Sequence, residues 1–325
     1  MFPDKYIVLT GGVGFIGSCV LKALNDLNTD NIIVVDNLGA ADKWKNLLGK
    51  RFYDVIHKDN LFEWLKGRER DIEAFIHLGA CSSTVEKDAN YLLENNYRFS
   101  IDLVEYALNN EHRFIYASSA STYGDGSEGF SDLEDQLDTF RPLNMYGQSK
   151  HLFDLWLKRQ NLLDKVVGLK YFNVFGPNEF HKGRMASAIM KMVPDALNTG
   201  KIRLFKSSDP AKYKDGGQLR DFIYVKDAAG MTIQFLENDL CGIYNIGTGE
   251  PQTWNSLAKA VINALDRPIQ IEYIDMPQDL LGKYQNYTCA DMEKTKLRKL
   301  RLPAYTLDAA VTEYIQNYLL PGQYL

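Results

Sequence analysis

A glycine-rich turn between an apolar strand and an apolar helix constrains this chain more than any other feature. The apolar run 6–9 is followed by Gly11, Gly14 and Gly17, three residues apart, and then by the apolar stretch 19–24. This spacing permits a tight turn, lets the backbone approach a phosphate and lets the next helix present its N-terminal N–H groups and positive dipole end. The segment therefore predicts a strand, a turn and a helix that bind a dinucleotide pyrophosphate.

An acidic residue follows at the distance that such a unit requires. Asp36 closes the second apolar run, 32–35, near the roughly 20-residue offset at which a carboxylate or its neighbours meet an adenosine ribose. The glycine spacing alone matches many turns between a strand and a helix. Together with the N-terminal strand and Asp36, it predicts a dinucleotide-binding unit.

The composition limits the partners and the compartment that fit this chain. Its 325 residues can bury a large core, and a formal net charge of −5 gives no basic surface for nucleic acid. The four cysteines have neither CxxC nor zinc spacing, which favours a reducing cytoplasm and no metal site. Met1 leads almost directly into the first strand, and no apolar run approaches the roughly 20 residues of a membrane span. We expect a soluble, cytoplasmic protein without a signal peptide or a membrane partner.

Short β-prone runs alternate with helix-length segments along the first half of the chain. These runs lie at residues 74–78, 113–117 and 166–171, and a further run lies later in the chain, at residues 242–246. This alternation is typical of a parallel sheet with helices on both faces. We expect an α/β fold with a Rossmann-type, doubly wound parallel sheet in residues 1–175. Residues 176–325 are expected to form a smaller α/β substrate domain with some chain crossover, and 206–217 a long surface loop.

Tyr146 and Lys150 stand four residues apart, so a helix would place them side by side on one face. A phenol with a pKa near 10 is a poor base at neutral pH, but an adjacent ammonium and an oxidised nicotinamide would both favour the phenolate. Tyr146 could then take a hydroxyl proton while hydride leaves. Such a pair is common on solvated helix faces. The hydroxyl cluster 118–122 gives it a context, because it follows a predicted strand and lies at the carboxyl end of the sheet, where ligands bind.

The strand, the hydroxyl cluster, the Tyr-x-x-x-Lys pair and the glycine turn together resemble the extended short-chain dehydrogenase/reductase family. The resemblance implies a Rossmann domain, a bound NAD or NADP and a sugar nucleotide as substrate. It also implies that Ser119 hydrogen-bonds the reacting oxygen and that Tyr146 is the acid/base. Lys150 would hold the nicotinamide ribose and tune Tyr146.

Longer strings sharpen the resemblance and extend it over nearly the whole chain. The specific strings are at 79–84 and 181–187, and further ones lie at 36–38, 94–97, 171–177 and 220–225. They look like those of the ADP-L-glycero-D-manno-heptose 6-epimerases. That family implies inversion of C6 of an ADP-heptose through a transient 6-ketone, a product that feeds lipopolysaccharide core synthesis, and a ring-like homo-oligomer of the pentamer type. Two departures are Arg184, where the family has serine, and a longer 206–217 loop.

Lys182 lies in a loop after a Gly-Pro pair, and its local sequence does not distinguish it from a solvated lysine. The resemblance supplies a role for it. In this family the lysine at that position is a second acid/base, on the side of the sugar opposite the tyrosine. An epimerase needs such a group because hydride must return to the other face of the ketone.

The choice between NAD and NADP depends on three residues near Asp36. Asp36 by itself favours a free ribose 2′-hydroxyl and hence NAD. Lys43 and Lys58 fall where the resembling family places lysines around an adenosine 2′-phosphate, and Asn37 adds a neutral donor. We therefore expect NADP, with NAD as the alternative.

The same resemblance implies further contacts to the cofactor and the substrate. Those to the cofactor, besides the glycines, come from Phe15, Ile16, Leu78, Cys81, Ser82, Asn95, Val174 and Lys182. Those to the substrate, besides Ser119, come from Asn173, Arg184, Lys191, Phe205, Arg220 and Tyr284. Arg220 is the best suited of these to an ADP diphosphate, because a guanidinium binds phosphate through two parallel hydrogen bonds.

Three other functions fit parts of the pattern. A sugar-nucleotide 4,6-dehydratase needs an acid beside the active-site hydroxyl, but Ala120 and Ser121 follow Ser119 and cannot protonate a leaving hydroxyl. A UDP-sugar 4-epimerase would use the same Ser, Tyr and Lys set and stays an alternative. A redox-sensing regulator that binds a dinucleotide without turnover would not need the acid/base tyrosine.

Overall fold

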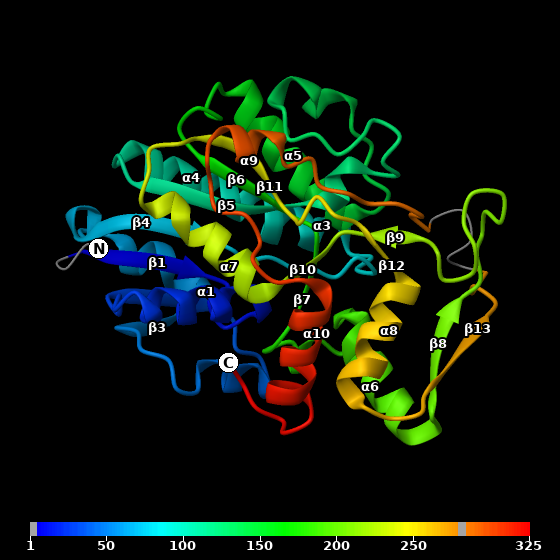
Figure 1. Cartoon of the computed structure of the whole chain (residues 1–325). Coiled ribbons are helices and arrows are strands. Elements are labelled where there is room, and N and C mark those ends of the chain that lie inside the picture. The colour runs from blue at the N-terminus through cyan, green and yellow to red at the C-terminus, as the bar shows by residue number, and fades with distance from the viewer. Residues whose placement is uncertain (1–4, 279–283) are drawn as a thin grey trace.

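The computed structural model of the chain describes residues 5–278 and 284–325 (Figure 1). A seven-stranded sheet has the strand order β11-β6-β5-β4-β1-β2-β3, and every neighbouring pair is parallel. The strands are β1 (Tyr6–Thr10), β2 (Ile32–Asp36), β3 (Asp54–His57), β4 (Ile72–His77), β5 (Arg113–Ser119), β6 (Val167–Tyr171) and β11 (Gly242–Ile246). The predicted Rossmann-type parallel sheet is confirmed. Its order reverses between β1 and β4, and ligands bind at such a switch point, outside the carboxyl ends of the strands.

Two apolar clusters cover the two faces of this sheet, which explains why its strands are nearly continuous apolar runs. One face packs against α1 (Phe15–Asp26) and α7 (Val225–Ile233), which contact each other along their lengths (Figure 1). The other face packs against α2 (Leu61–Leu65), α4 (Phe99–Asn109) and α5 (Met145–Arg159). The short helix α3 (Ala89–Leu92) continues through a π-helical turn, Leu93–Arg98, into α4.

A second region lies beside the carboxyl edge of the sheet (Figure 1). Its helices are α6 (Ala188–Thr199), α8 (Trp254–Leu265) and α10 (Leu307–Tyr314), whereas α9 (Glu293–Leu297) lies against β11 of the large sheet. Its strands pair as β7 (Asn173–Phe175) with β10 (Phe222–Tyr224), β8 (Lys201–Phe205) with β13 (Gln270–Ile274), and β9 (Leu219–Arg220) with β12 (Gln252–Thr253). Residues 206–218 form a loop between β8 and β9. Since β11 lies beside β6 in the large sheet, the two regions exchange chain.

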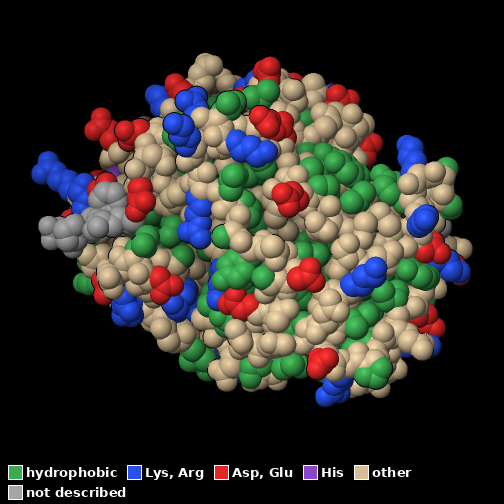
Figure 2. All heavy atoms as spheres, viewed as in Figure 1, with side chains coloured by type: hydrophobic (Ala, Val, Ile, Leu, Met, Phe, Trp, Pro, Cys, Tyr) green, Lys and Arg blue, Asp and Glu red, His purple; other side chains and the backbone are tan. Residues whose placement is uncertain are grey.

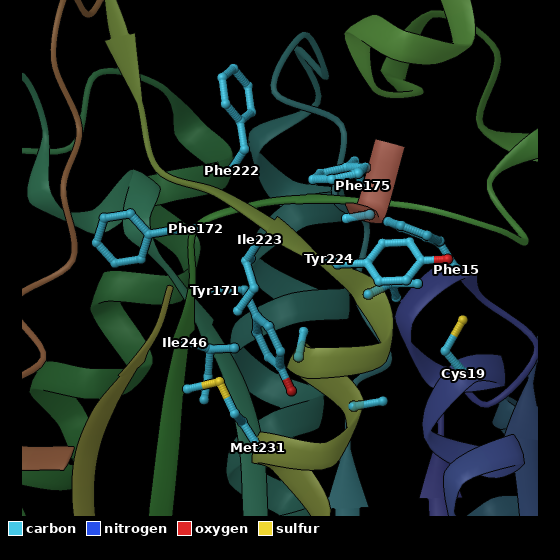
Figure 3. Packing of buried hydrophobic residues seen from close by; sticks show 14 of the residues in the cluster. Phe15, Cys19, Tyr171, Phe172, Phe175, Phe222, Ile223, Tyr224, Met231 and Ile246 are labelled. Atoms are coloured by element: carbon cyan, nitrogen blue, oxygen red, sulfur yellow. The ribbon is translucent and has the colours of Figure 1, made fainter. Parts of the chain in front are cut away.

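Aromatic residues from both regions pack together next to the glycine turn (Figure 3). Phe15 begins α1, Phe175 ends β7 and Tyr224 ends β10; all three are buried, and the rings of Phe175 and Tyr224 lie 5.6 Å apart. Their packing fixes the start of α1 relative to the chain that leaves β6, which is the chain that carries Lys182.

Charged side chains of both signs are interspersed on the face drawn in Figure 2. No helix in the described part of the chain is long and apolar enough to cross a membrane.

Candidate active site

The glycine turn is closely packed against the neighbouring backbone. Gly11 has φ +70°, and a Cβ on it would lie 2.6 Å from the backbone nitrogen of Gly79 at the end of β4. A Cβ on Gly17 would lie 2.1 Å from the carbonyl oxygen of Gly11, and the Gly14 N–H donates to that oxygen at 2.9 Å. Side chains are therefore excluded here, and the N-terminus of α1 stays open to a phosphate.

Asp36, at the end of β2, turns toward this loop. Its carboxylate accepts hydrogen bonds from the Val13 N–H at 2.9 Å and the Asn37 N–H at 2.7 Å, and it pairs with Lys43. Lys58 donates to Asn95 Oδ1 at 3.1 Å. A cavity of about 350 Å³, which we call the adenosine cavity, is lined by residues that were predicted to contact the cofactor. They are Asp36, Asn37, Lys43, Lys58, Cys81 and Asn95.

A second cavity, of about 390 Å³, shares Gly11, Asp36 and Lys43 with the first. We call it the reaction cleft. It brings together residues that lie far apart in the sequence, namely Gly14, Phe15, Ile16, Gly17, Leu78, Ser82, Ser119, Tyr146, Lys150, Val174 and Lys182. All of the predicted cofactor residues therefore line one of these two cavities. His181, which sequence reasoning did not select although it starts the 181–187 string, lines both.

Regular elements position Ser119, Tyr146 and Lys150. Ser119 is the last residue of β5, and α5 begins at Met145 after its N-cap Asn144, whose side chain accepts the Gly147 N–H at 2.8 Å. A Cβ on Gly147 would lie 2.7 Å from the carbonyl oxygen of Ser121, so the helix approaches the turn after β5 closely. Tyr146 and Lys150 then face the cleft beside Ser119.

Burial controls the protonation of this set. It raises the pKa of Tyr146, and the interaction with the Ser119 hydroxyl opposes that rise. It also lowers the pKa of Lys150 to about 8, against the attraction of Asp154. Desolvation disfavours both charged forms, so burial opposes the phenolate that Lys150 and an oxidised nicotinamide were expected to favour. Tyr146 is held as a neutral phenol, a proton donor.

A buried ion pair that sequence reasoning missed lies beneath Ser119. Asp154 and Lys170 are fully buried and 2.8 Å apart. The Asp154 carboxylate also accepts hydrogen bonds from Tyr116 at 2.9 Å and Ser118 at 2.7 Å. The pair thus ties α5 to β5 and β6. Its sequence signal is weak: Asp154 stands four residues after Lys150 on one helix face, and Lys170 interrupts an apolar strand.

Lys182 lies on η7 (Phe180–Met185), a short 3₁₀ segment that breaks at Gly183, where φ is 52° and ψ is −120°. Its Nζ is 4.8 Å from the centroid of the Phe15 ring. Burial lowers its pKa, and the charge of Glu179 opposes the change. Lys182 is therefore not a solvated loop lysine: it lines both the reaction cleft and a third, larger cavity.

This third cavity, of about 540 Å³, joins most of the predicted substrate residues. Its lining includes Trp254, which sequence reasoning missed, and Asn173, Lys182, Lys191, Phe205 and Tyr284. The buried guanidinium of Arg220 lies beside it, 4.9 Å from the Tyr284 ring and 5.9 Å from the Trp254 ring. Arg184 does not line the cavity. Its side chain is exposed, and its carbonyl accepts from Lys191 Nζ at 2.9 Å.

Comparison with known proteins identifies the family. Residues 7–247 match the NAD dependent epimerase/dehydratase family. The chain belongs to this family. It is also 48% identical over 315 residues to the ADP-L-glycero-D-manno-heptose-6-epimerase of Nitratidesulfovibrio vulgaris (strain DP4), with 96% of this chain and 97% of the relative covered. The resemblance to the heptose 6-epimerases is thereby confirmed, and the chain is an enzyme of the epimerase type.

Solved structures agree with this epimerase over nearly its full length. The crystal structure of the Helicobacter pylori ADP-L-glycero-D-manno-heptose-6-epimerase matches with a TM-score of 0.81 and 26% identity, covering 97% of this chain and 96% of that one. The UDP-N-acetylglucosamine 4-epimerase of Methanobrevibacter ruminantium matches with a TM-score of 0.81 and 26% identity, covering 99% and 100%.

A nicotinamide cofactor fits the epimerase's own residues. The glycine turn has room for a phosphate only because Gly11 and Gly17 lack side chains. Of the two cavities that meet there, one is lined by Lys58 and Asn95 and the other by Ser119, Tyr146 and Lys150. Within residues 5–278 and 284–325, no cluster of three or more His, Cys, Asp or Glu side chains could hold a metal ion.

Proposed function

We propose that this epimerase inverts C6 of ADP-D-glycero-D-manno-heptose through a transient 6-ketone and gives ADP-L-glycero-D-manno-heptose. One observation carries the proposal: Tyr146 on α5 and Lys182 on η7 line the same cleft. The two epimers present the C6 hydroxyl from different sides of the carbon. Two separate acid/base groups in one cleft suit that reaction, whereas a one-sided dehydrogenase needs only one.

Each residue of the reaction cleft has a separate role in this proposal. Ser119 hydrogen-bonds the C6 oxygen, and Tyr146 exchanges a proton with it in one epimer. A nicotinamide held by the reaction cleft would supply the acceptor for hydride from C6 and the donor for its return. Rotation about C6, where the reaction cleft meets the larger cavity at Lys182, would turn the other face of the ketone toward the cofactor, and Lys182 then exchanges the proton. A lysine whose pKa is lowered by burial suits this role, because its neutral amine forms more readily than that of a solvated lysine.

Cations beside the larger cavity support an ADP-linked substrate. Arg220 is buried against Tyr284 and Trp254, and burial lowers its pKa, so a phosphate partner would relieve its desolvation. We assign Arg220 and Lys191 to the diphosphate, and Asn173, Phe205 and Tyr284 to the rest of the substrate. Arg184 would act only at the rim.

We propose NADP as the tightly bound cofactor. Lys43 and Lys58 line the adenosine cavity together with Asn37, and Lys43 can bridge Asp36 and a 2′-phosphate. Replacing both lysines with Ala should weaken NADP binding by roughly 10²- to 10⁴-fold, since each loses a charged contact worth about 1.5–3 kcal/mol, and should change NAD binding far less. Equal losses for both cofactors in titration calorimetry would remove the basis for NADP.

The test of the function is direct. Purified protein is incubated with ADP-D-glycero-D-manno-heptose, and the C6 epimers are resolved by chromatography while nicotinamide absorbance is followed. We expect interconversion without net consumption of nicotinamide. The structural match to a UDP-N-acetylglucosamine 4-epimerase makes a UDP-sugar 4-epimerase the second candidate. Epimerisation of UDP-N-acetylglucosamine in a parallel assay, with none of the heptose, would favour it instead.

We further propose a cytoplasmic enzyme of lipopolysaccharide core synthesis, with a cofactor domain in residues 1–175 and a substrate domain in 176–325 that share β11. A ring-like homo-oligomer, as implied by the family resemblance, completes the proposal. Light scattering of the purified protein tests the oligomeric state.

A further inference from the structure

A buried carboxylate, that of Glu179, links the two ends of the segment that carries Lys182. Glu179 is fully buried. One oxygen accepts the Ser187 N–H at 2.6 Å, and the other accepts the Ser187 hydroxyl at 2.6 Å and the Tyr314 hydroxyl at 2.8 Å. Ser187 is the N-cap of α6, and Tyr314 ends α10. Glu179 therefore joins both ends of segment 180–186 to a helix that is distant in the sequence.

Nothing comparable holds the Lys182 side chain itself. Within the described ranges, no hydrogen bond or ion pair to Lys182 Nζ is present; its ammonium lies over the Phe15 ring at 4.8 Å. Its N–H donates to the Glu179 carbonyl at 3.0 Å, and the Ala186 N–H donates to the Gly183 carbonyl at 3.2 Å. The position of the amine in the cleft is thus set by the backbone path of the segment.

Hydrogen bonds to a carboxylate are roughly twice as strong as those between neutral groups, and they fix geometry closely. Glu179 has three of them, all from neutral donors, and all reach outside the segment. Loss of one donor should loosen the segment without leaving a bare buried charge. The negative charge of Glu179 also acts on Lys182, where it opposes the effect of burial.

We propose that Glu179 is a positioning residue, which acts through Ser187 and Tyr314 to hold segment 180–186 where Lys182 can reach the C6 oxygen. This inference rests on the proposed role of Lys182 as the second acid/base. Glu179 itself is fully buried, so it acts through the segment and not on the substrate.

The test compares variants that each remove one donor to Glu179. Tyr314→Phe and Ser187→Ala remove one hydroxyl each, and Ser187→Thr restores a hydroxyl. Tyr244→Phe is the matched control, because it removes a buried tyrosine hydroxyl that donates to the Cys241 carbonyl at 3.1 Å, on β11. Two activities are measured: C6 epimerisation, and dismutation of a C6-aldehyde analogue, in which two aldehydes and water give one acid and one alcohol. An aldehyde carbon has no configuration to invert, so dismutation does not require hydride transfer at the second face of C6. It therefore serves as the internal reference.

We expect Tyr314→Phe and Ser187→Ala to lower epimerisation 10- to 100-fold, the effect of a displacement of roughly 1 Å in a catalytic group. Dismutation should stay near the wild-type rate, Ser187→Thr should recover epimerisation, and Tyr244→Phe should change neither activity. A purely structural role for Glu179 would lower both activities in proportion. That result, or unchanged epimerisation in both variants, would overturn the inference.

Lys182→Ala in the same assays separates this inference from the proposed function. Normal epimerisation by Lys182→Ala removes both. Loss of epimerisation in Lys182→Ala together with normal rates in Tyr314→Phe and Ser187→Ala removes the inference alone. Circular dichroism checks folding, and if Tyr314→Phe does not fold, the Ser187→Ala and Ser187→Thr pair decides the question.

Discussion

The two predicted acid/base groups line one cleft but are held in different ways. Tyr146 lies in the first turn of α5, whose N-cap Asn144 is two residues away. Lys182 lies on a short segment with a positive φ at Gly183, and one of its anchors, the Glu179–Tyr314 hydrogen bond, spans 135 residues of sequence. The Tyr146 side is thus built from local structure, whereas the Lys182 side depends on the packing of the whole second region.

The two sides also differ in charge. Under Tyr146, the buried carboxylate of Asp154 is paired with Lys170, whereas the Glu179 carboxylate near Lys182 has neutral donors. Burial raises the pKa of Tyr146 and lowers that of Lys182. Burial thus favours the neutral form of both groups, which suits the pairing of a proton donor with a proton acceptor in one cleft.

The largest expected effect is on the locally built side. Tyr146→Phe should lower both epimerisation and aldehyde dismutation by roughly 10²- to 10⁴-fold, the usual contribution of general acid/base catalysis. Thermal unfolding and cofactor retention should match the wild type, because Phe keeps the aromatic ring and removes only the contact with the Ser119 hydroxyl. Steady-state rates of a folded variant that remain near normal would sink the assignment of Tyr146.

Lys182→Ala should lower epimerisation by roughly 10²-fold or more and leave dismutation close to the wild-type rate. The reason is that only the return of hydride to the second face depends on this amine. Lys165→Ala, at an exposed lysine, is the control for loss of a positive charge. The two-base mechanism fails if Lys182→Ala and Tyr146→Phe impair the two activities identically.

The pH dependence of stability tests the burial of the Tyr146 side. Lys150 has its pKa lowered from 10.5 to about 8, so the folded chain loses this proton before the unfolded chain does. Between pH 8 and pH 10.5 the unfolded state binds more protons than the folded state. The free energy of unfolding therefore rises with pH over this range, by on the order of 3 kcal/mol. Lys150→Met should abolish that rise.

Urea unfolding of the wild type and of Lys150→Met at both pH values measures the difference. Lys165→Met provides the background for removing an exposed lysine. Equal pH slopes in the wild type and in Lys150→Met would show that Lys150 keeps its hydration in the folded chain.

The smallest effect concerns the backbone of the Lys182 side. Gly183→Ala places a side chain at φ 52° and ψ −120°, at a cost of about 1–3 kcal/mol. Gly67→Ala is the matched control, since Gly67 has φ +73° with open space around its Cβ position. Both variants should lose stability, but only Gly183→Ala should lower epimerisation, by about 10-fold. Equal activity in the two variants would mean that the path of the segment does not matter.

Sequence reasoning found the parts of the site that rest on short-range patterns. The glycine turn, Asp36 at the end of β2 and the four-residue spacing of Tyr146 and Lys150 all read directly from periodicity and turn chemistry. It missed the Asp154–Lys170 pair and the Glu179 contacts, and its assignment of the exposed Arg184 to the substrate stays a prediction. Buried ion pairs and loop anchors join residues that no periodic pattern connects.

The sequence by itself determined the parallel sheet, the dinucleotide turn and the helix that carries Tyr146, because each follows from residues within about one element of one another. The tertiary structure decided that β11 joins the large sheet, that Lys182 is mostly buried beside Phe15, and that burial raises the pKa of Tyr146. The physical reason is that desolvation and long-range contacts depend on which segments pack together. That packing is a property of the whole folded chain, whereas a turn or a helix face is a property of a few neighbouring residues.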